Sequence, residues 1–171
     1  SDILNLSYCP DLAAGLPQIS EDKLSYTYNL RKDATWDDGS SITAEDAIFM
    51  LKANKCPLTA NPATKGYFEN IETVIPDAKD NYTFTIKMKK QYILNIAFLT
   101  DFPLMQRSYF DPQNILSQYS FKQFNDSTFN ADAEQKLTAW ATEFNHAKYG
   151  SDATSLNSSG PHTVTERTPA L

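Results

Sequence analysis

The chain has 171 residues, 41% hydrophobic and 21% charged, which is long enough to bury the core of one globular domain. Its formal net charge of -6 argues against nucleic-acid binding, which needs a basic face to neutralise phosphates. The best apolar run, residues 92–99, is interrupted by Asn95 and is much shorter than the roughly 18 residues of a membrane helix, so we expect no direct membrane span.

The first predicted element is a β-strand over residues 25–32. Apolar and polar side chains alternate there with a period of two, Tyr26, Tyr28 and Leu30 falling on one face. A turn at Asp37-Asp38-Gly39 follows, because an Asp-Gly pair tolerates positive φ.

A helix is predicted over residues 43–53. Thr43 is the expected N-cap, its hydroxyl accepting from the Asp46 amide, and Glu45 and Asp46 place negative charge at the positive end of the helix dipole. One apolar face is expected from Ala44, Ala47, Ile48 and Leu51.

An irregular loop is predicted over residues 54–66, where Pro57, Pro62 and Gly66 interrupt any regular element. Two runs of strand formers follow at residues 71–75 and 82–89, separated by the turn residues 76–81. We expect these runs to pair as an antiparallel hairpin.

The clearest amphipathic helix is predicted over residues 132–148, capped by Asn130 or Asp132 and stopped by Gly150. Its expected apolar face comprises Ala133, Leu137, Trp140, Ala141 and Phe144. After a polar loop at residues 151–159, Gly160-Pro161 is expected to open a final strand. The predicted fold class is therefore mixed α/β, a small mainly antiparallel sheet packed by two principal helices.

The order of signals in residues 26–47 resembles the signature of the family-5 extracellular solute-binding proteins, the peptide- and nickel-type receptors of ABC importers. The matching residues are Leu30-Arg31, Trp36, Asp38-Gly39 and Ala44-Glu45-Asp46. Weaker likenesses to the same family lie at residues 10–13, 82–88, 102–105 and 157–166, with His162 and Arg167 standing where the family shows Tyr and an aromatic residue.

The resemblance implies that residues 1–171 form a single domain, a fragment of lobe one of a larger two-lobe, periplasmic-binding-protein-like receptor. It implies an extracytoplasmic or periplasmic location, with a signal segment upstream and a lipoprotein anchor on the full-length protein. The expected role is capture of a peptide or small solute for an ABC permease, by hinge closure around the ligand. The alternative is an interaction or structural domain that keeps the scaffold without transport.

We expect no catalytic residue, no metal and no cofactor. The two histidines, His146 and His162, lie far apart, and no H-E-x-x-H, C-x-x-C, G-x-S-x-G or phosphate-loop motif occurs. Aligning Gly39 with the glycine of a calcium loop puts Ala34 and Trp36 at positions that must supply oxygen ligands, so a calcium site is excluded there.

Aromatic residues on irregular segments are the candidate ligand contacts, because aromatic walls with a few polar groups make a solute pocket. These candidates are Tyr67, Phe68 and Phe102. The alternative for each is packing in the core, where aromatic side chains are common.

Cys9 and Cys56 leave two alternatives open. A disulfide between them would suit an exported protein and would contribute about 4 kcal/mol on the chain-entropy model. The other alternative is a pair of buried, reduced thiols, because two cysteines are too few for a disulfide framework.

Overall fold

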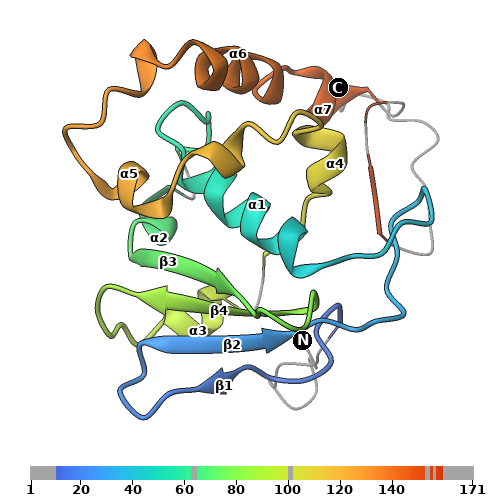
Figure 1. The fold of residues 1–171 in the computed structure, drawn as a ribbon, viewed down its shortest axis with the longest axis vertical. Helices are drawn as coiled ribbons and strands as arrows, with labels where there is room; N and C mark the ends of the chain where they lie inside the picture. The colour runs from blue at the N-terminus through green and yellow to red at the C-terminus, as the bar shows by residue number, and fades with distance from the viewer. Residues whose placement is uncertain (1–10, 63–64, 100–101, 153–154, 156, 160–171) are drawn as a thin grey trace, which may run out of the picture.

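The computed structural model describes residues 11–62, 65–99, 102–152, 155 and 157–159. It has three layers, a four-stranded antiparallel sheet, the helix α1 (Ala44–Lys55) above it, and the helix α6 (Gln135–Phe144) above α1 (Figure 1). The mixed α/β class with two principal helices is confirmed.

The sheet has the strand order β1-β2-β4-β3, formed by β1 (Gln18–Ile19), β2 (Ser25–Asn29), β4 (Thr83–Met88) and β3 (Ile71–Pro76). The predicted hairpin is confirmed, since β3 and β4 are antiparallel neighbours. The strand predicted to reach residue 32 ends at Asn29. Asn29 is paired with Thr83, the first residue of β4, so the strand has no β4 partner beyond it.

The two faces of the sheet differ in polarity. The face toward α1 is apolar and buried, formed by Tyr26, Tyr28, Ile71, Val74, Phe84, Ile86 and Met88. On the other face the hydroxyls of Thr27 and Thr85 bond to each other at 2.8 Å across β2 and β4. A half-solvated antiparallel sheet explains the alternation seen in the sequence.

The helix α1 is buried on two sides. Its predicted apolar face packs on the sheet, with Ala47 and Leu51 fully buried. Its opposite face, missed from the sequence, carries Phe49 and Ala53 into a second core beneath α6. The helix also continues to Lys55, two residues past the predicted end.

Short helices connect these layers. They are α2 (Lys65–Phe68), α3 (Asn95–Leu99), α4 (Arg107–Phe110), the 3-10 turn η1 (Leu116–Gln118) and α5 (Phe121–Asn125). The irregular loop is therefore shorter than the predicted range of residues 54–66. The first two residues of that range belong to α1 and the last two to α2.

The predicted boundaries of the last helix are wrong at both ends. Residues Ala131–Ala133 form the separate 3-10 turn η2, and Glu134 is the N-cap of α6 in place of Asn130 or Asp132. Ala133 is consequently exposed and lies outside the apolar face.

Asn145 ends α6 where Gly150 was expected to do so. The Asn145 side chain accepts from the Ala60 amide at 2.9 Å and donates to the Leu58 carbonyl at 2.8 Å, which fixes the chain as it leaves the helix. Gly150 instead lies within α7 (Lys148–Ser151). The final strand expected at Gly160-Pro161 lies outside the described residues.

The outer edge of β3 is partly covered. The register of β3 shifts between Ile71 and Thr73, which places a bulge at Glu72. The Asn125 side-chain amide from α5 donates to the Glu72 carbonyl at 2.9 Å and lies 3.4 Å from the Ile71 carbonyl. The two carbonyls at the bulge are thus already bonded.

Lys55 ties the end of α1 to the chain after α2. Its side chain is 7% exposed, and its Nζ donates to the carbonyls of Phe68 at 3.0 Å and Glu69 at 3.3 Å. Burial, with a smaller effect from Lys89, lowers the pKa of Lys55 from 10.5 to about 8, and Glu69 opposes that change.

We therefore expect Lys55 to contribute a rise in the stability of the chain with pH between about 8 and 10. In this window Lys55 is mostly neutral in the folded state and mostly protonated in the unfolded chain, so unfolding takes up a proton and becomes less favourable as the pH rises. The rise should be on the order of 2 kcal/mol, since one pKa unit corresponds to about 1.4 kcal/mol. Urea unfolding at pH 7, 8, 9 and 10 measures it.

Lys55→Met is the matched variant for this measurement. It keeps the apolar stem and removes the titrating group, so its free energy of unfolding should lose most of the rise across the same window. Burial raises the pKa of Cys56 above its ordinary value of 9.0 and that of Tyr28 above 10.0, and each lowers stability as the pH rises through that ordinary value. Both groups are present in the two proteins, so the difference between the two pH series measures Lys55, and the series stops at pH 10. Equal slopes for the two proteins would contradict the prediction.

Candidate functional site

An apolar groove lies beside the edge of the sheet at β1. It has a volume of about 720 Å³, and its apolar walls are Ile19, Tyr26, Tyr92, Ile93 and Ile96. We call this set the apolar groove. Tyr26 is buried, whereas Ile19, Tyr92 and Ile93 are 44%, 54% and 87% exposed. The size falls within the range of small-molecule and peptide pockets.

Hydrogen bonds hold the two sides of the apolar groove together. Gln91, after β4, donates its side-chain amide to the Asp22 carbonyl at 2.6 Å. Asp22 itself shapes the turn between β1 and β2, because its Oδ1 accepts from the Leu24 amide at 3.0 Å and the Ser20 hydroxyl at 2.5 Å. The hydrogen bonds that the Asp22 carboxylate accepts, first from the Ser20 hydroxyl and then from the Leu24 amide, lower the pKa of Asp22. Hydrogen bonds within the chain therefore fix the two sides of the groove relative to each other.

Lys23 is the next residue in that turn and has a φ of 53°. This left-handed conformation is uncommon for residues other than glycine and asparagine. We expect Lys23→Gly to raise the free energy of unfolding by about 0.5–1 kcal/mol, because glycine relieves the strain. Thermal unfolding measures it, with Lys87→Gly in β4, at negative φ, as the control that should destabilise the chain. A loss of stability in Lys23→Gly would contradict the prediction.

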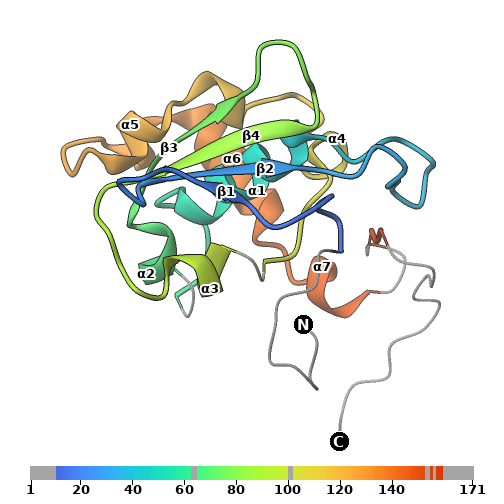
Figure 2. The same ribbon diagram turned by 90° about the horizontal axis from the view of Figure 1, so that it is seen from below.

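The structure brings two of the three predicted ligand contacts together. Tyr67 and Phe68 lie on α2, next to α3 (Figure 2). Phe98 of α3 stacks on Tyr67 with ring centroids 5.0 Å apart and meets Phe68 edge-on at 4.9 Å. Tyr67 is 54% exposed and Phe68 is 4% exposed, so only Tyr67 offers a broad surface to a ligand.

The third predicted contact, Phe102, is partly buried against the sheet-side core. Among the described residues no ring contact joins it to Tyr67 or Phe68. Phe98, which the sequence reasoning missed, is the residue that organises this aromatic group. The sequence feature that contains Phe98 is the apolar run over residues 92–99, which was compared only with the length of a membrane helix.

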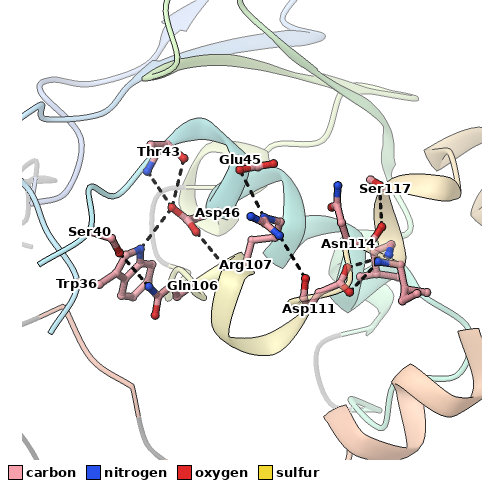
Figure 3. A network of polar contacts seen from close by, with 12 residues as sticks. Trp36, Ser40, Thr43, Glu45, Asp46, Gln106, Arg107, Asp111, Asn114 and Ser117 are labelled. Atoms are coloured by element: carbon pink, nitrogen blue, oxygen red, sulfur yellow. Dashed lines mark hydrogen bonds and ion pairs between the residues drawn. The ribbon is translucent and has the colours of Figure 1, made fainter. Parts of the chain in front are cut away.

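A polar network surrounds the N-terminus of α1 (Figure 3). The N-cap at Thr43 is confirmed, and the buried Asp46 carboxylate accepts from the Thr43 amide at 2.9 Å. The same carboxylate accepts from Trp36 Nε1 at 3.3 Å and from the Arg107 amide at 2.8 Å. Asp46 thus joins the turn, α1 and α4 at one point.

A second buried carboxylate continues this network beyond α4. Asp111 is 1% exposed and accepts from the amides of Ile115 at 2.7 Å and Leu116 at 2.8 Å. Lys52 of α1 donates to the Leu116 carbonyl at 3.1 Å. Burial lowers the pKa of Lys52, and the nearby charge of Asp111 opposes the shift. Both carboxylates therefore satisfy backbone amides and have no geometry for acid–base catalysis.

The Asp-Asp-Gly turn also contacts the end of the described chain. Gln106 is 3% exposed, and its Nε2 donates to Asp38 Oδ2 at 2.7 Å and to Ser40 Oγ at 2.9 Å. Its side-chain oxygen, Oε1, accepts from the side-chain amide of Asn157. Asp37 Oδ2 accepts from the Ser158 hydroxyl at 2.6 Å. Bonds from Ser40 and Gln106 lower the pKa of Asp38. These residues fasten residues 157–158 to the turn.

The described residues show no catalytic arrangement. No group of three or more His, Cys, Asp or Glu side chains in the described ranges is placed to hold a metal ion. His146 is exposed after α6, and its Nδ1 accepts from the Lys148 amide at 3.1 Å, while His162 lies outside the described residues. Within the same ranges, no helix is long and apolar enough to cross a membrane.

Cys56 is fully buried, and burial raises the pKa of its thiol. A thiol with a raised pKa is a weak nucleophile at neutral pH. Cys56 is a free, buried thiol in the structure, which agrees with the alternative of buried, reduced thiols for this residue. Cys9 lies outside the described residues.

The comparisons with known proteins agree on one family. The model described as "Bacterial extracellular solute-binding proteins, family 5 Middle" matches residues 7–170. The chain is 26% identical over 88 residues to the periplasmic oligopeptide-binding protein OppA of Escherichia coli (strain K12), covering 49% of this chain and 16% of that protein.

Two solved structures extend the likeness to the fold. OppA of Listeria monocytogenes, bound to peptide, matches 91% of this chain and 27% of its own with a TM-score of 0.61 and 20% identity. NikZ of Campylobacter jejuni, in complex with Ni(L-His), matches 71% of this chain and 22% of its own with a TM-score of 0.51 and 29% identity. The chain therefore spans less than a third of the length of these relatives.

Proposed function

The chain belongs to the family-5 bacterial extracellular solute-binding proteins, and from that membership we propose that it is part of the receptor of an ABC-type importer. The family is a binding family and is not enzymatic. The proposed receptor captures a peptide or a related solute outside the cytoplasm and delivers it to a membrane permease. A lipid anchor on the full-length protein belongs to the same proposal.

The match of the family model to residues 7–170 carries this proposal. The relatives' names indicate the class of solute, an oligopeptide for the two OppA proteins and Ni(L-His) for NikZ.

We propose further that residues 1–171 form a segment of lobe one in a two-lobe receptor. Hinge closure around the solute needs both lobes, so the 171-residue chain alone should bind weakly. Calorimetry with a mixture of short peptides and with Ni(L-His), on this chain and on the intact receptor, tests both points. Tight binding by the 171-residue chain alone would contradict the two-lobe proposal, and no heat from either protein would contradict the solute class.

Tyr67, Phe68 and Phe102 are the proposed ligand contacts. The exposed ring of Tyr67, backed by Phe98, is the surface best placed to stack on a ligand. The buried ring of Phe68 supports it from behind by its edge-on contact with Phe98. Phe102, in the segment after α3, is partly buried against the sheet-side core and makes no described ring contact with the other two.

We expect Tyr67→Ala to weaken peptide binding by the intact receptor about tenfold, the equivalent of about 1.4 kcal/mol. Because the ring is half exposed and makes its described ring contact with Phe98, the variant should fold. Calorimetry measures the affinity, and Tyr109→Ala is the control, since Tyr109 is another exposed tyrosine, on α4, whose described ring contacts are with Phe110 and Tyr149 and not with the aromatic group of α2 and α3. Equal affinities for the two variants would remove Tyr67 from the site.

A further inference from the structure

The apolar groove is not explained by the proposed ligand contacts. Exposed large apolar side chains are ordinary when scattered, but a contiguous set marks a contact surface. Ile19, Tyr92 and Ile93 line one groove, and Ile93 is almost completely exposed.

The charge around the apolar groove also favours a contact surface. The chain carries a net charge of -6, yet the charged residues lining the groove are one acid and one base, Glu21 and Lys23. Protein interfaces are depleted of charge at their centre and enriched in aromatic side chains such as Tyr92. The bond from Gln91 to the Asp22 carbonyl ties the two sides of this surface together.

The relatives indicate what covers such a surface. In OppA of Listeria monocytogenes the fold that matches 91% of this chain accounts for 27% of that chain, so about three quarters of that protein lies outside the match. Additional chain of that length is enough to cover an apolar surface on the matched segment.

We propose that the apolar groove is the surface on which the remainder of the receptor packs, an inference that rests on the proposed two-lobe function. The occupant is the receptor's own polypeptide, which covers Ile19, Tyr92 and Ile93 with apolar side chains. The groove therefore joins the segment to the rest of the receptor and does not hold solute.

Cysteine labelling tests this proposal. Ile93→Cys places a thiol in the groove, and Lys79→Cys places a matched thiol on the exposed turn between β3 and β4. Each variant is made in the 171-residue chain and in the intact receptor, and the parent proteins give the background from the native cysteines. We expect maleimide to label Ile93→Cys at least tenfold more slowly in the intact receptor, with Lys79→Cys unchanged. Equal rates at Ile93→Cys would overturn the proposal.

Two further experiments on the 171-residue chain test the other possible occupants of the groove, a second copy of the chain and the solute. Sedimentation velocity shows whether the 171-residue chain associates, and association abolished by Ile93→Lys would assign the groove to a second copy. Protection of Ile93→Cys by short peptides in the 171-residue chain would assign it to the solute. Either result would overturn the proposal.

The labelling result can be distinguished from a failure of the proposed function. Protection of Ile93→Cys in an intact receptor that binds no peptide or Ni(L-His) would leave the packing surface standing and remove the solute class. Solute binding by an intact receptor in which Ile93→Cys is not protected would support the solute class and overturn the packing surface.

Discussion

Asp46→Asn is expected to lower the free energy of unfolding by about 3 kcal/mol. The two carboxylate oxygens accept from four donors, the Arg107 amide on one and the Thr43 amide, the Thr43 hydroxyl and Trp36 Nε1 on the other. An asparagine of the same shape must turn its NH₂ toward one of these donors, which leaves buried hydrogen-bonding groups unpaired. For a chain of this size the loss corresponds to a fall in Tm of about 6–12 °C.

Urea and thermal unfolding measure the loss, and Glu45→Gln is the matched control. Glu45 is the neighbouring acid in the first turn of α1, and its ion pair with Arg107 spans 3.4 Å with the Glu45 side chain 61% exposed. An exposed pair contributes at most about 1 kcal/mol. Equal losses for the two variants would show that Asp46 acts only through the helix dipole.

Trp140→Ala is expected to cost about 4 kcal/mol, the second large effect. Trp140 is the main contact of α6 with the core beneath it, since its ring stacks on Phe144 at 4.8 Å and meets Phe49 of α1 edge-on at 6.3 Å. Its Nε1 also donates to the Phe110 carbonyl at 3.0 Å. Removing the ring therefore leaves a cavity and an unpaired carbonyl.

Hydrogen exchange locates this loss. We expect amides of α6 to exchange much faster in Trp140→Ala, while those of β4, on the far side of α1, keep most of their protection. Lys136→Ala, on the exposed side of α6, controls for a change in helix propensity and should move the stability by less than about 0.5 kcal/mol. A uniform loss of protection across both elements would mean that the two cores open together.

Strand and helix periodicity predicted the parts of the fold that repeat over many residues. The alternation around Tyr26 and Tyr28, the hairpin of β3 and β4, and the helices α1 and α6 all followed from local patterns. The short helices could not be predicted, because four or five residues complete barely one turn and show no periodicity. The second buried face of α1 was missed since it exists only in the presence of α6.

The signature at residues 36–46 shows the same limit more sharply. Turn and capping rules explained Asp38 and Asp46 as local features, and the capping role is confirmed. The structure adds partners far along the chain, because Asp46 bonds to Arg107 across 61 residues and Asp38 to Gln106 across 68. Nothing in a single sequence marks Gln106 or the Arg107 amide as those partners.

The candidate site was the least predictable part. Aromatic residues on irregular segments indicated Tyr67 and Phe68, and both do lie on one aromatic group with Phe98. The apolar groove escaped notice because Ile19, Tyr26 and Ile93 come from three separate segments, and only the sheet pairing and the turn at Asp22 place them together.

The bonded edge of β3 has a consequence for how copies of this chain meet at high concentration. An unprotected edge strand recruits strands from other molecules and starts fibrillar aggregates. Asn125 occupies the carbonyls at the bulge, Pro76 ends the strand without an amide donor, and the opposite edge, β1, is two residues long. The sheet is therefore a poor template for strand addition, which lowers the tendency of the chain to aggregate irreversibly.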